Sequence, residues 1–255
     1  MIACGFEQHI AFPCFFFRYK SGLSKPDIAF VHVDDIIVGF ATEEAKDEFK
    51  RAGEKRFKVF KSEKPTGVVG IDIDDSRHPS KGRTIKLHQE NFIREASERL
   101  KTKDLPSVDS PWLMPGTREG VQSVLEEFSP FHICGILIWV RVTRHDTLGP
   151  VSEMARYASK PEEFQFQEAE QVMRYLQGTP TRGVRFTKKE STRLVSYPDA
   201  NWKGDWNDRR ARLAVIHILL GGSVNPVCMK RTITVELPKP RGPRSKARRE
   251  KLLAQ

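Results

Sequence analysis

The sequence predicts an α+β fold in which strands gather near the two ends of the chain and helices fill the middle. Runs rich in β-branched residues, bounded by Gly, Pro and Asp, occur before residue 90 and again after residue 182. Between those runs, apolar residues recur at the three- and four-residue spacing of helices. Of the 255 residues, 38% are hydrophobic and 30% are charged, a balance that allows a modest core.

The first hundred residues are expected to form two hairpins and two helices. A hairpin over 29–40 leads to Thr42, which can cap a helix with an acidic first turn, and Gly53 ends or weakens that helix. The other predicted elements are strands at 12–17, 28–33, 68–74 and 84–89, a polar loop at 75–83 and a helix at 90–101.

The rest of the chain is expected to hold a linker, three helices and a final group of strands. The predicted elements are a linker at 102–130, helices at 131–142, 147–158 and 164–177, and strands at 183–186, 194–197, 213–220 and 233–237. The third of these helices carries Ala169, Val172, Met173 and Leu176 on one face, which predicts a core stripe, and Gly178 ends it.

Charge and cysteine content indicate which kinds of binding site and which cellular location to expect. The net charge is +10, but residues 239–255 alone hold seven Lys and Arg against one Glu, so the basic excess lies mainly in a tail that cannot form a core. The four cysteines show no CxxC spacing, so we expect neither a zinc site nor disulfides, and an intracellular location, cytoplasmic or nuclear. The longest apolar runs fall short of the roughly 20 residues that span a bilayer, and the N-terminus lacks signal-peptide features.

Two adjacent carboxylates, Asp34 and Asp35, stand between two β-prone runs and are expected at the tip of the first hairpin. The nearest basic residues in the sequence are Lys25 and Lys46, so neither carboxylate has a local cation. Two unpaired carboxylates on a stiff tip repel each other unless water or a divalent cation screens them. Aspartate is also a common turn residue, so a solvated turn and a metal-binding tip are both open.

Five segments, taken in order, resemble the C-terminal part of the Pol polyprotein of copia-type retrotransposons, over about residues 1–237. Residues 32–35, His-Val-Asp-Asp, are similar to the reverse transcriptase box Tyr-Val-Asp-Asp. Residues 197–202, Tyr-Pro-Asp-Ala-Asn-Trp, are similar to Tyr-Ser-Asp-Ala-Asp-Trp, which opens the family's ribonuclease H domain. The other similar segments are 69–73 with 85–89, 143–146 and 174–179.

The resemblance implies a partial reverse transcriptase palm with β-hairpins, a helical thumb-like region and a truncated ribonuclease H-like sheet. The implied boundaries are 1–103 for the palm, with the primer grip in its second hairpin, 104–182 for the linker and thumb-like region, 183–237 for the ribonuclease H-like segment and 238–255 for a basic, disordered tail.

The implied activity is that of an RNA-directed DNA polymerase, with Asp34, Asp35 and Asp199 as catalytic residues and Mg²⁺ ligands. Asp35 is either a second ligand or an electrostatic support. Asp199 matches the first carboxylate of ribonuclease H, although from the residues alone it can equally be a turn residue. The implied partners are an RNA/DNA template–primer duplex, contacted at its phosphates by Lys and Arg, and a dNTP; no membrane is implied.

Three departures from the family lead us to expect a chain that is inactive alone. A palm needs a further aspartate from an earlier strand, and Asp27, the only Asp before Asp34, lacks the family's context. Arg241 stands where the family has a ribonuclease H Glu, and the later carboxylates are absent. The family's Ser-Thr-x-Gly stretch is replaced by residues 211–214.

Two other functions remain open. The chain can be a non-catalytic nucleic-acid-binding remnant, or a degraded open reading frame without a selected function. The basic tail also allows two interpretations: a frameshift or misread exon end, or a segment for nucleic-acid binding or nuclear import.

Overall fold

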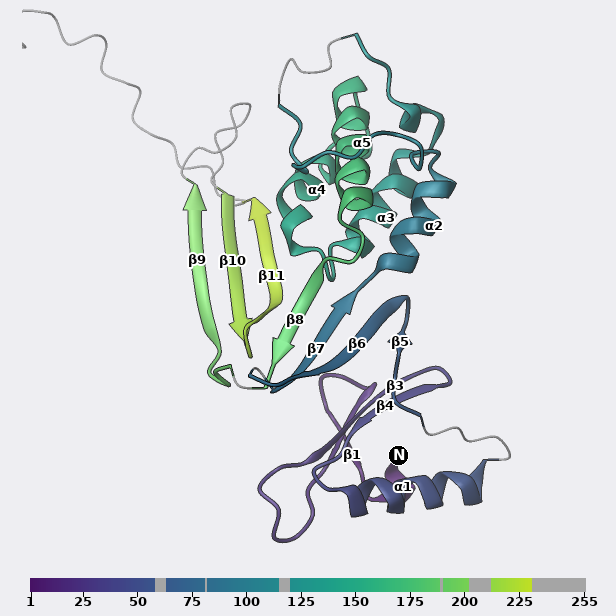
Figure 1. The fold of residues 1–255 in the computed structure, drawn as a ribbon, viewed down its shortest axis with the longest axis vertical. Helices are drawn as coiled ribbons and strands as arrows, with labels where there is room; N and C mark the ends of the chain where they lie inside the picture. Colours follow the sequence, from purple (N-terminus) through teal and green to yellow (C-terminus); the bar gives the residue numbers. More distant parts are fainter. Residues whose placement is uncertain (58–62, 81, 115–119, 189, 202–211, 231–255) are drawn as a thin grey trace, which may run out of the picture. The chain divides into compact units, whose positions relative to one another are not determined.

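The computed structural model describes residues 1–57, 63–80, 82–114, 120–188, 190–201 and 212–230 (Figure 1). Within these residues the chain has five α-helices and three antiparallel sheets, so the predicted α+β class is confirmed. The chain divides between Ile73 and Asp74 into two compact units. No helix in the described part of the chain is long and apolar enough to cross a membrane.

The first unit contains a four-stranded antiparallel sheet, ordered β1-β2-β3-β4, and one helix. Its elements are η1 (Ile2–Cys4), β1 (Glu7–Gln8), β2 (Phe15–Arg18), β3 (Asp27–His32), β4 (Asp35–Gly39), α1 (Glu43–Arg56), β5 (Gly67–Val68) and the start of β6 (Ile71–His78). Thr42 caps α1 as predicted, because its Oγ1 accepts a hydrogen bond from the backbone N–H of Ala45 at 3.3 Å.

The first sheet buries one face and exposes the other. Along β3, Ala29 is fully buried, whereas Ile28 and Phe30 are each 42% exposed. Successive side chains of a strand point to opposite faces, so this alternation separates the two faces of the sheet. The ring of Phe49 from α1 meets the ring of the buried Phe6 edge-on at 5.9 Å, and together they cover the face that carries Ala29.

The second unit combines a group of helices with two sheets (Figure 1). Its helical elements are α2 (Glu90–Arg99), η2 (Val124–Glu127), α3 (Pro130–Val140), η3 (His145–Thr147), α4 (Leu148–Ala155) and α5 (Glu163–Gly178). Its strands are the rest of β6, then β7 (Gly82–His88), β8 (Gly183–Thr187), β9 (Val195–Asn201), β10 (Arg212–Leu219) and β11 (Gly222–Lys230). β7 lies between β6 and β8, and β10 lies between β9 and β11.

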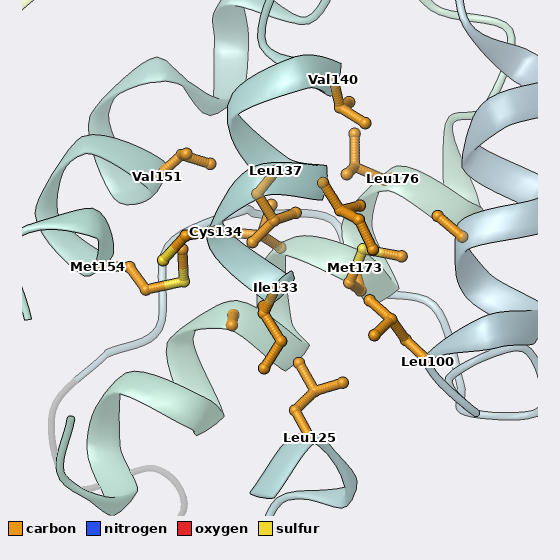
Figure 2. Close-up of a cluster of buried hydrophobic side chains, with 14 of the residues drawn as sticks. Leu100, Leu125, Ile133, Cys134, Leu137, Val140, Val151, Met154, Met173 and Leu176 are labelled. Atoms are coloured by element: carbon orange, nitrogen blue, oxygen red, sulfur yellow. The ribbon is translucent and has the colours of Figure 1, made fainter. Parts of the chain in front are cut away.

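One apolar cluster, drawn from all four helices of this unit, forms the core (Figure 2). α5 contributes the predicted stripe of Ala169, Val172, Met173 and Leu176, each at most 1% exposed. Burying one large apolar side chain contributes about 1.5–3 kcal/mol, so this cluster is the main source of stability in the unit. Its other members are Ile93, Ala96, Leu100, Leu125, Ile133, Cys134, Ile136, Leu137, Val140, Val151 and Met154.

Residues 102–114, predicted to be part of a linker, form a strap that lies along α5. Side chains one turn apart on α5 hold the strap. Gln177 Nε2 donates to Thr102 Oγ1 (2.8 Å), Arg174 Nε to the Pro106 carbonyl (2.7 Å) and Gln171 Nε2 to the Ser110 carbonyl (2.9 Å). This spacing places the donors in a row on one face of the helix, so an extended segment can run beside them.

Most predicted elements are confirmed to within a few residues. The four helices predicted at 90–101, 131–142, 147–158 and 164–177 correspond to α2, α3, α4 and α5. The strands predicted at 12–17, 28–33, 84–89, 183–186, 194–197 and 213–220 correspond to β2, β3, β7, β8, β9 and β10.

The second predicted hairpin was wrong in its details. Residues 68–74 are not one strand, because Val69 and Gly70, with φ of 49° and 72°, form a tight turn between β5 and β6. β6 and β7 also extend into the predicted loop at 75–83.

Of the two alternatives for Gly53, the one in which it ends α1 was wrong; one strand was not predicted, and part of the chain lies outside the described residues. Gly53 lies inside α1 and is buried, so it does not end the helix. β11 was missed because Asn225, with φ of 42°, and Pro226 interrupt its strand pattern. The strand predicted at 233–237, the position of Arg241 and the basic tail lie outside the described residues.

Gly149 in α4 lies against the strap, because a Cβ at this position would come within 2.5 Å of Trp112 Cζ2. We expect Gly149→Ala to lower the free energy of unfolding by about 1–3 kcal/mol, as overpacking does, measured by urea denaturation. Gly135→Ala in α3 is the matched control, since its Cβ meets no atom within 4 Å, and it should be neutral or stabilising by up to about 1 kcal/mol. Equal losses in the two variants would contradict the packing of the strap.

Glu168 in α5 is buried, and its Oε2 has no hydrogen-bond partner among the described residues. Burial raises the pKa of this carboxyl to about 7, because apolar surroundings disfavour the charged form. The folded chain therefore favours the neutral acid. The stability that Glu168 contributes is fully present below its unfolded pKa near 4.5 and is lost as the pH rises through 7.

We expect Glu168→Gln to raise the free energy of unfolding at pH 8 by up to roughly 3 kcal/mol, and at pH 5 by less than about 1 kcal/mol. Thermal unfolding followed by circular dichroism at both pH values measures the difference. Glu170→Gln is the control, because Glu170 Oε2 accepts a hydrogen bond from Ser123 Oγ at 2.8 Å, and it should stabilise at neither pH. A gain for Glu168→Gln that does not change with pH would argue against the raised pKa.

Candidate metal site at the first hairpin

Asp34 and Asp35 lie at the tip of the hairpin formed by β3 and β4. Val33 and Asp34 make a two-residue turn, and Asp35 opens β4 opposite His32. The β-branched residues on both sides favour strands, and the turn joins them without a longer loop. The predicted position of the two aspartates at a hairpin tip is therefore confirmed, while their catalytic role stays a prediction.

Val33 holds a strained backbone directly before the two carboxylates. Its φ is 52° and its side chain is 88% exposed. Gly, Asn or Asp normally occupies such a position, and a β-branched residue there costs on the order of 1–3 kcal/mol. Val69 and Leu220 have similar positive φ values in the turns before β6 and β11, so this strain does not by itself mark a functional site.

The two carboxylates are exposed, and among the described residues neither has a hydrogen-bond or ion-pair partner. Carboxylates of this kind suit Mg²⁺, which keeps several waters and binds one or two carboxylates together with substrate phosphates. No three His, Cys, Asp or Glu side chains come together to hold a metal in the described part of the chain. Asp34 and Asp35 therefore fit one hydrated ion and do not fit a complete two-metal site.

Asp27, the remaining aspartate before this pair, is engaged elsewhere. It lies at the start of β3, five residues from the turn, and is 1% exposed. Its Oδ2 accepts hydrogen bonds from Arg18 Nη2 (2.8 Å) and Nε (3.1 Å), and its Oδ1 accepts one from the backbone N–H of Ala41 (2.8 Å). A strand rises about 3.3 Å per residue, so this carboxylate lies well over 10 Å from the tip and supplies no third ligand.

Asp199 lies in the middle of β9, where it pairs with Ala214 of β10, and its side chain is exposed. The alternative that Asp199 is a turn residue is wrong. No cluster of metal-binding side chains includes it among the described residues. Three register positions away, Ser196 Oγ and His217 Nδ1 lie 2.7 Å apart across the two strands.

Three of the segments that carry the family resemblance meet in one polar network of the second unit. Arg144, 1% exposed, donates from Nη2 to Asp146 Oδ2 (2.8 Å) and from Nη1 to the Thr179 carbonyl (2.8 Å). Thr143 Oγ1 is hydrogen-bonded to the side-chain amide of Gln89 at 2.8 Å. The network ties η3 to the start of α2 and the end of α5, so these segments have a structural role that sequence reasoning did not identify.

Tyr175 completes this network, since its hydroxyl donates to Asp146 Oδ2 at 2.6 Å. Burial by itself would raise the pKa of Asp146, but the hydrogen bonds from Arg144 and Tyr175 outweigh it and hold the pKa below its usual value. Asp146 is therefore a charged, fully engaged carboxylate that is held by its neighbours.

Comparison with known proteins gives a distant relationship. No protein-family model and no solved structure matches the chain. It is 26% identical over 181 residues to the retrovirus-related Pol polyprotein from transposon RE1 of Arabidopsis thaliana, over 70% of this chain and 12% of that polyprotein. It is 26% identical over 204 residues to the putative transposon Ty5-1 protein YCL074W of Saccharomyces cerevisiae, over 77% of this chain and 63% of that protein.

The chain is distantly similar to copia-type retrotransposon Pol polyproteins over much of its length. It is also 38% identical over 90 residues to the secreted RxLR effector protein 161 of Plasmopara viticola, over 35% of this chain and 63% of that protein. The chain spans less than two thirds of the length of each of these relatives.

Asp27 has a structural role in the hairpin, whereas Asp34 and Asp35 are exposed at its tip. We expect Asp27→Asn to lower the free energy of unfolding by about 3 kcal/mol, because it leaves the buried Arg18 guanidinium without a charged partner. Asp34→Asn should change it by less than about 0.5 kcal/mol, as exposed substitutions do. Urea denaturation of both variants measures the contrast, and similar losses would show that the tip carboxylate is also part of the packing.

Proposed function

We propose that this chain is a fragment of a retrotransposon RNA-directed DNA polymerase that runs into the start of a ribonuclease H domain, and that it is inactive as a polymerase on its own. The observation that carries the proposal is the pair of exposed carboxylates at the β3–β4 tip, which have no ion-pair partner among the described residues, in a chain similar to Pol polyproteins. A polymerase requires carboxylates at a rigid, accessible position, and a two-residue hairpin turn supplies one.

In this proposal Asp34 and Asp35 would hold a Mg²⁺ ion at the site where the incoming dNTP binds. When bound, such an ion polarises the primer hydroxyl and stabilises charge on the transferred phosphoryl group. Among the described residues, no Lys or Arg side chain pairs with either carboxylate. The chain is inactive because Asp27, locked to Arg18, cannot complete the ligand set.

The proposed boundaries follow the resemblance. We assign 1–103 to the partial palm, with the primer grip near β6 and β7, 104–182 to the linker and thumb-like helices, and 183–237 to the ribonuclease H-like segment. Asp199 is the proposed first metal ligand of that last segment. Its place within β9 supports a rigid strand position for the carboxylate.

A second candidate function is binding of a template–primer duplex without catalysis. The observation that favours it is the helical unit, whose core cluster and Arg144 network are complete without any of the three proposed catalytic aspartates. A remnant of this kind needs only phosphate contacts from Lys and Arg on its surface.

Primer extension on an RNA template with Mg²⁺ or Mn²⁺ tests catalysis. We expect no synthesis above background from the wild-type chain, because the third carboxylate is not at the tip. Asp34→Ala should match the wild type. Robust synthesis that Asp34→Ala abolishes would overturn the proposed inactivity while supporting the proposed site.

Fluorescence anisotropy with a labelled RNA/DNA template–primer duplex tests binding. We expect affinity to fall by at least tenfold between 50 and about 200 mM salt, since each released counterion adds to the slope of log K against log salt. Asp34→Asn should leave that slope unchanged. No binding at low salt, or binding that salt does not weaken, would exclude a nucleic-acid-binding remnant.

A further inference from the structure

Glu168 continues the row of α5 side chains that hold the strap. Gln177, Arg174 and Gln171 follow one another at a spacing of three residues, and each donates a hydrogen bond to the strap. Residues three apart on a helix are neighbours on its surface, so Glu168 stands one turn beyond Gln171 in the same row. The row that holds the strap therefore ends on a carboxyl group.

Residues 110–114, which we call the strap end, run from α5 to α4. The Ser110 carbonyl is hydrogen-bonded to α5 at 2.9 Å. Two residues later, the ring of Trp112 lies directly against Gly149 of α4. The strap end therefore bridges the two helices beside the turn of α5 that carries Glu168.

Glu168 differs from the other members of the row in its hydrogen bonding. It is 6% exposed, and its Oε2 has no hydrogen-bond partner among the described residues. An ionised carboxylate only accepts hydrogen bonds, so it cannot donate to strap carbonyls as Gln171 and Arg174 do. Ionisation would leave a buried negative charge next to a segment whose carbonyls at Pro106 and Ser110 face α5.

Burial, and not a neighbouring charge, favours the neutral form of this carboxyl. The strap, η2, α3 and α4 pack around the N-terminal half of α5. Burial alone raises the pKa of Glu168 to about 7, and no charged side chain of the described residues contributes. The ionisable side chains of these surrounding segments include Asp109, Glu126, Glu127, His132, Glu153 and Arg156, of which the last two form an ion pair at 2.8 Å.

We propose that the strap end is a pH-operated latch, which stays docked on α5 while the Glu168 carboxyl is protonated and is released when that carboxyl ionises. Release lets water solvate the carboxylate. The apolar stripe of α5 that begins at Ala169 stays in the core, so only the strap end moves. The proposal is independent of the proposed polymerase origin, because it uses none of the three aspartates assigned to metal binding.

Fluorine NMR of the full chain labelled with 5-fluorotryptophan tests the latch through Trp112, whose resonance Trp112→Phe assigns. We expect the ratio of released to docked strap end to rise by roughly 50-fold between pH 5 and pH 8, because the docked carboxyl holds its proton up to about pH 7 and the released one only to about 4.5. The rise should level off above pH 7. Trp139 on α3 is the internal control, and its resonance should not follow this change.

Three variants separate the latch from other titrations. Glu168→Gln should keep the strap end docked at every pH, since an amide does not ionise. Glu170→Gln and His132→Gln should keep the transition, because Glu170 is hydrogen-bonded to Ser123 at 2.8 Å and His132 is exposed on α3. Circular dichroism confirms that all three fold.

The proposal would be overturned by a Trp112 resonance that does not change with pH. A transition that persists in Glu168→Gln, that disappears in His132→Gln, or that Trp139 follows in step would overturn it as well. The last result would show that Glu168 acts on the whole helical unit and not on the strap end.

Discussion

The buried ion pair between Arg18 and Asp27 fixes the geometry of the first sheet. The pair links directly opposed residues of β2 and β3, and Asp27 also accepts the backbone N–H of Ala41 just before α1. A buried pair of this kind is costly to break, so it fixes the register of the sheet and the entry of the helix together. It thereby places the Asp34–Asp35 tip at the far end of the hairpin, away from the one other aspartate that precedes it.

The two units use their polar residues in different ways. In the second unit, Arg144, Asp146, Tyr175 and Thr179 satisfy one another inside the fold, and the segments similar to Pol polyproteins are occupied in holding helices. In the first unit, the carboxylates at the tip have no such partner in the part of the chain that the structure describes. The side chains proposed to bind a metal ion therefore lie in the hairpin, whereas the polar side chains of the helical unit stabilise its fold.

The sequence predicts the regular elements of this chain well and its connections poorly. The helices follow from apolar spacing, as the Ala169–Leu176 stripe shows, and the hairpin tip follows from β-branched runs around the aspartates. The turn at Val69 could not be predicted, because a bulky residue there adopts a conformation typical of glycine. The burial of Asp27 depends on Arg18, nine residues away across a strand pair, and nothing in the local sequence indicates that pairing.

The strap along α5 has a consequence for how the chain reaches its native state. Residues 102–114 are made well before the side chains of Gln171, Arg174 and Gln177 that hold them. During synthesis this stretch has no partner until α5 emerges, so its docking is a long-range closure that comes late and slowly.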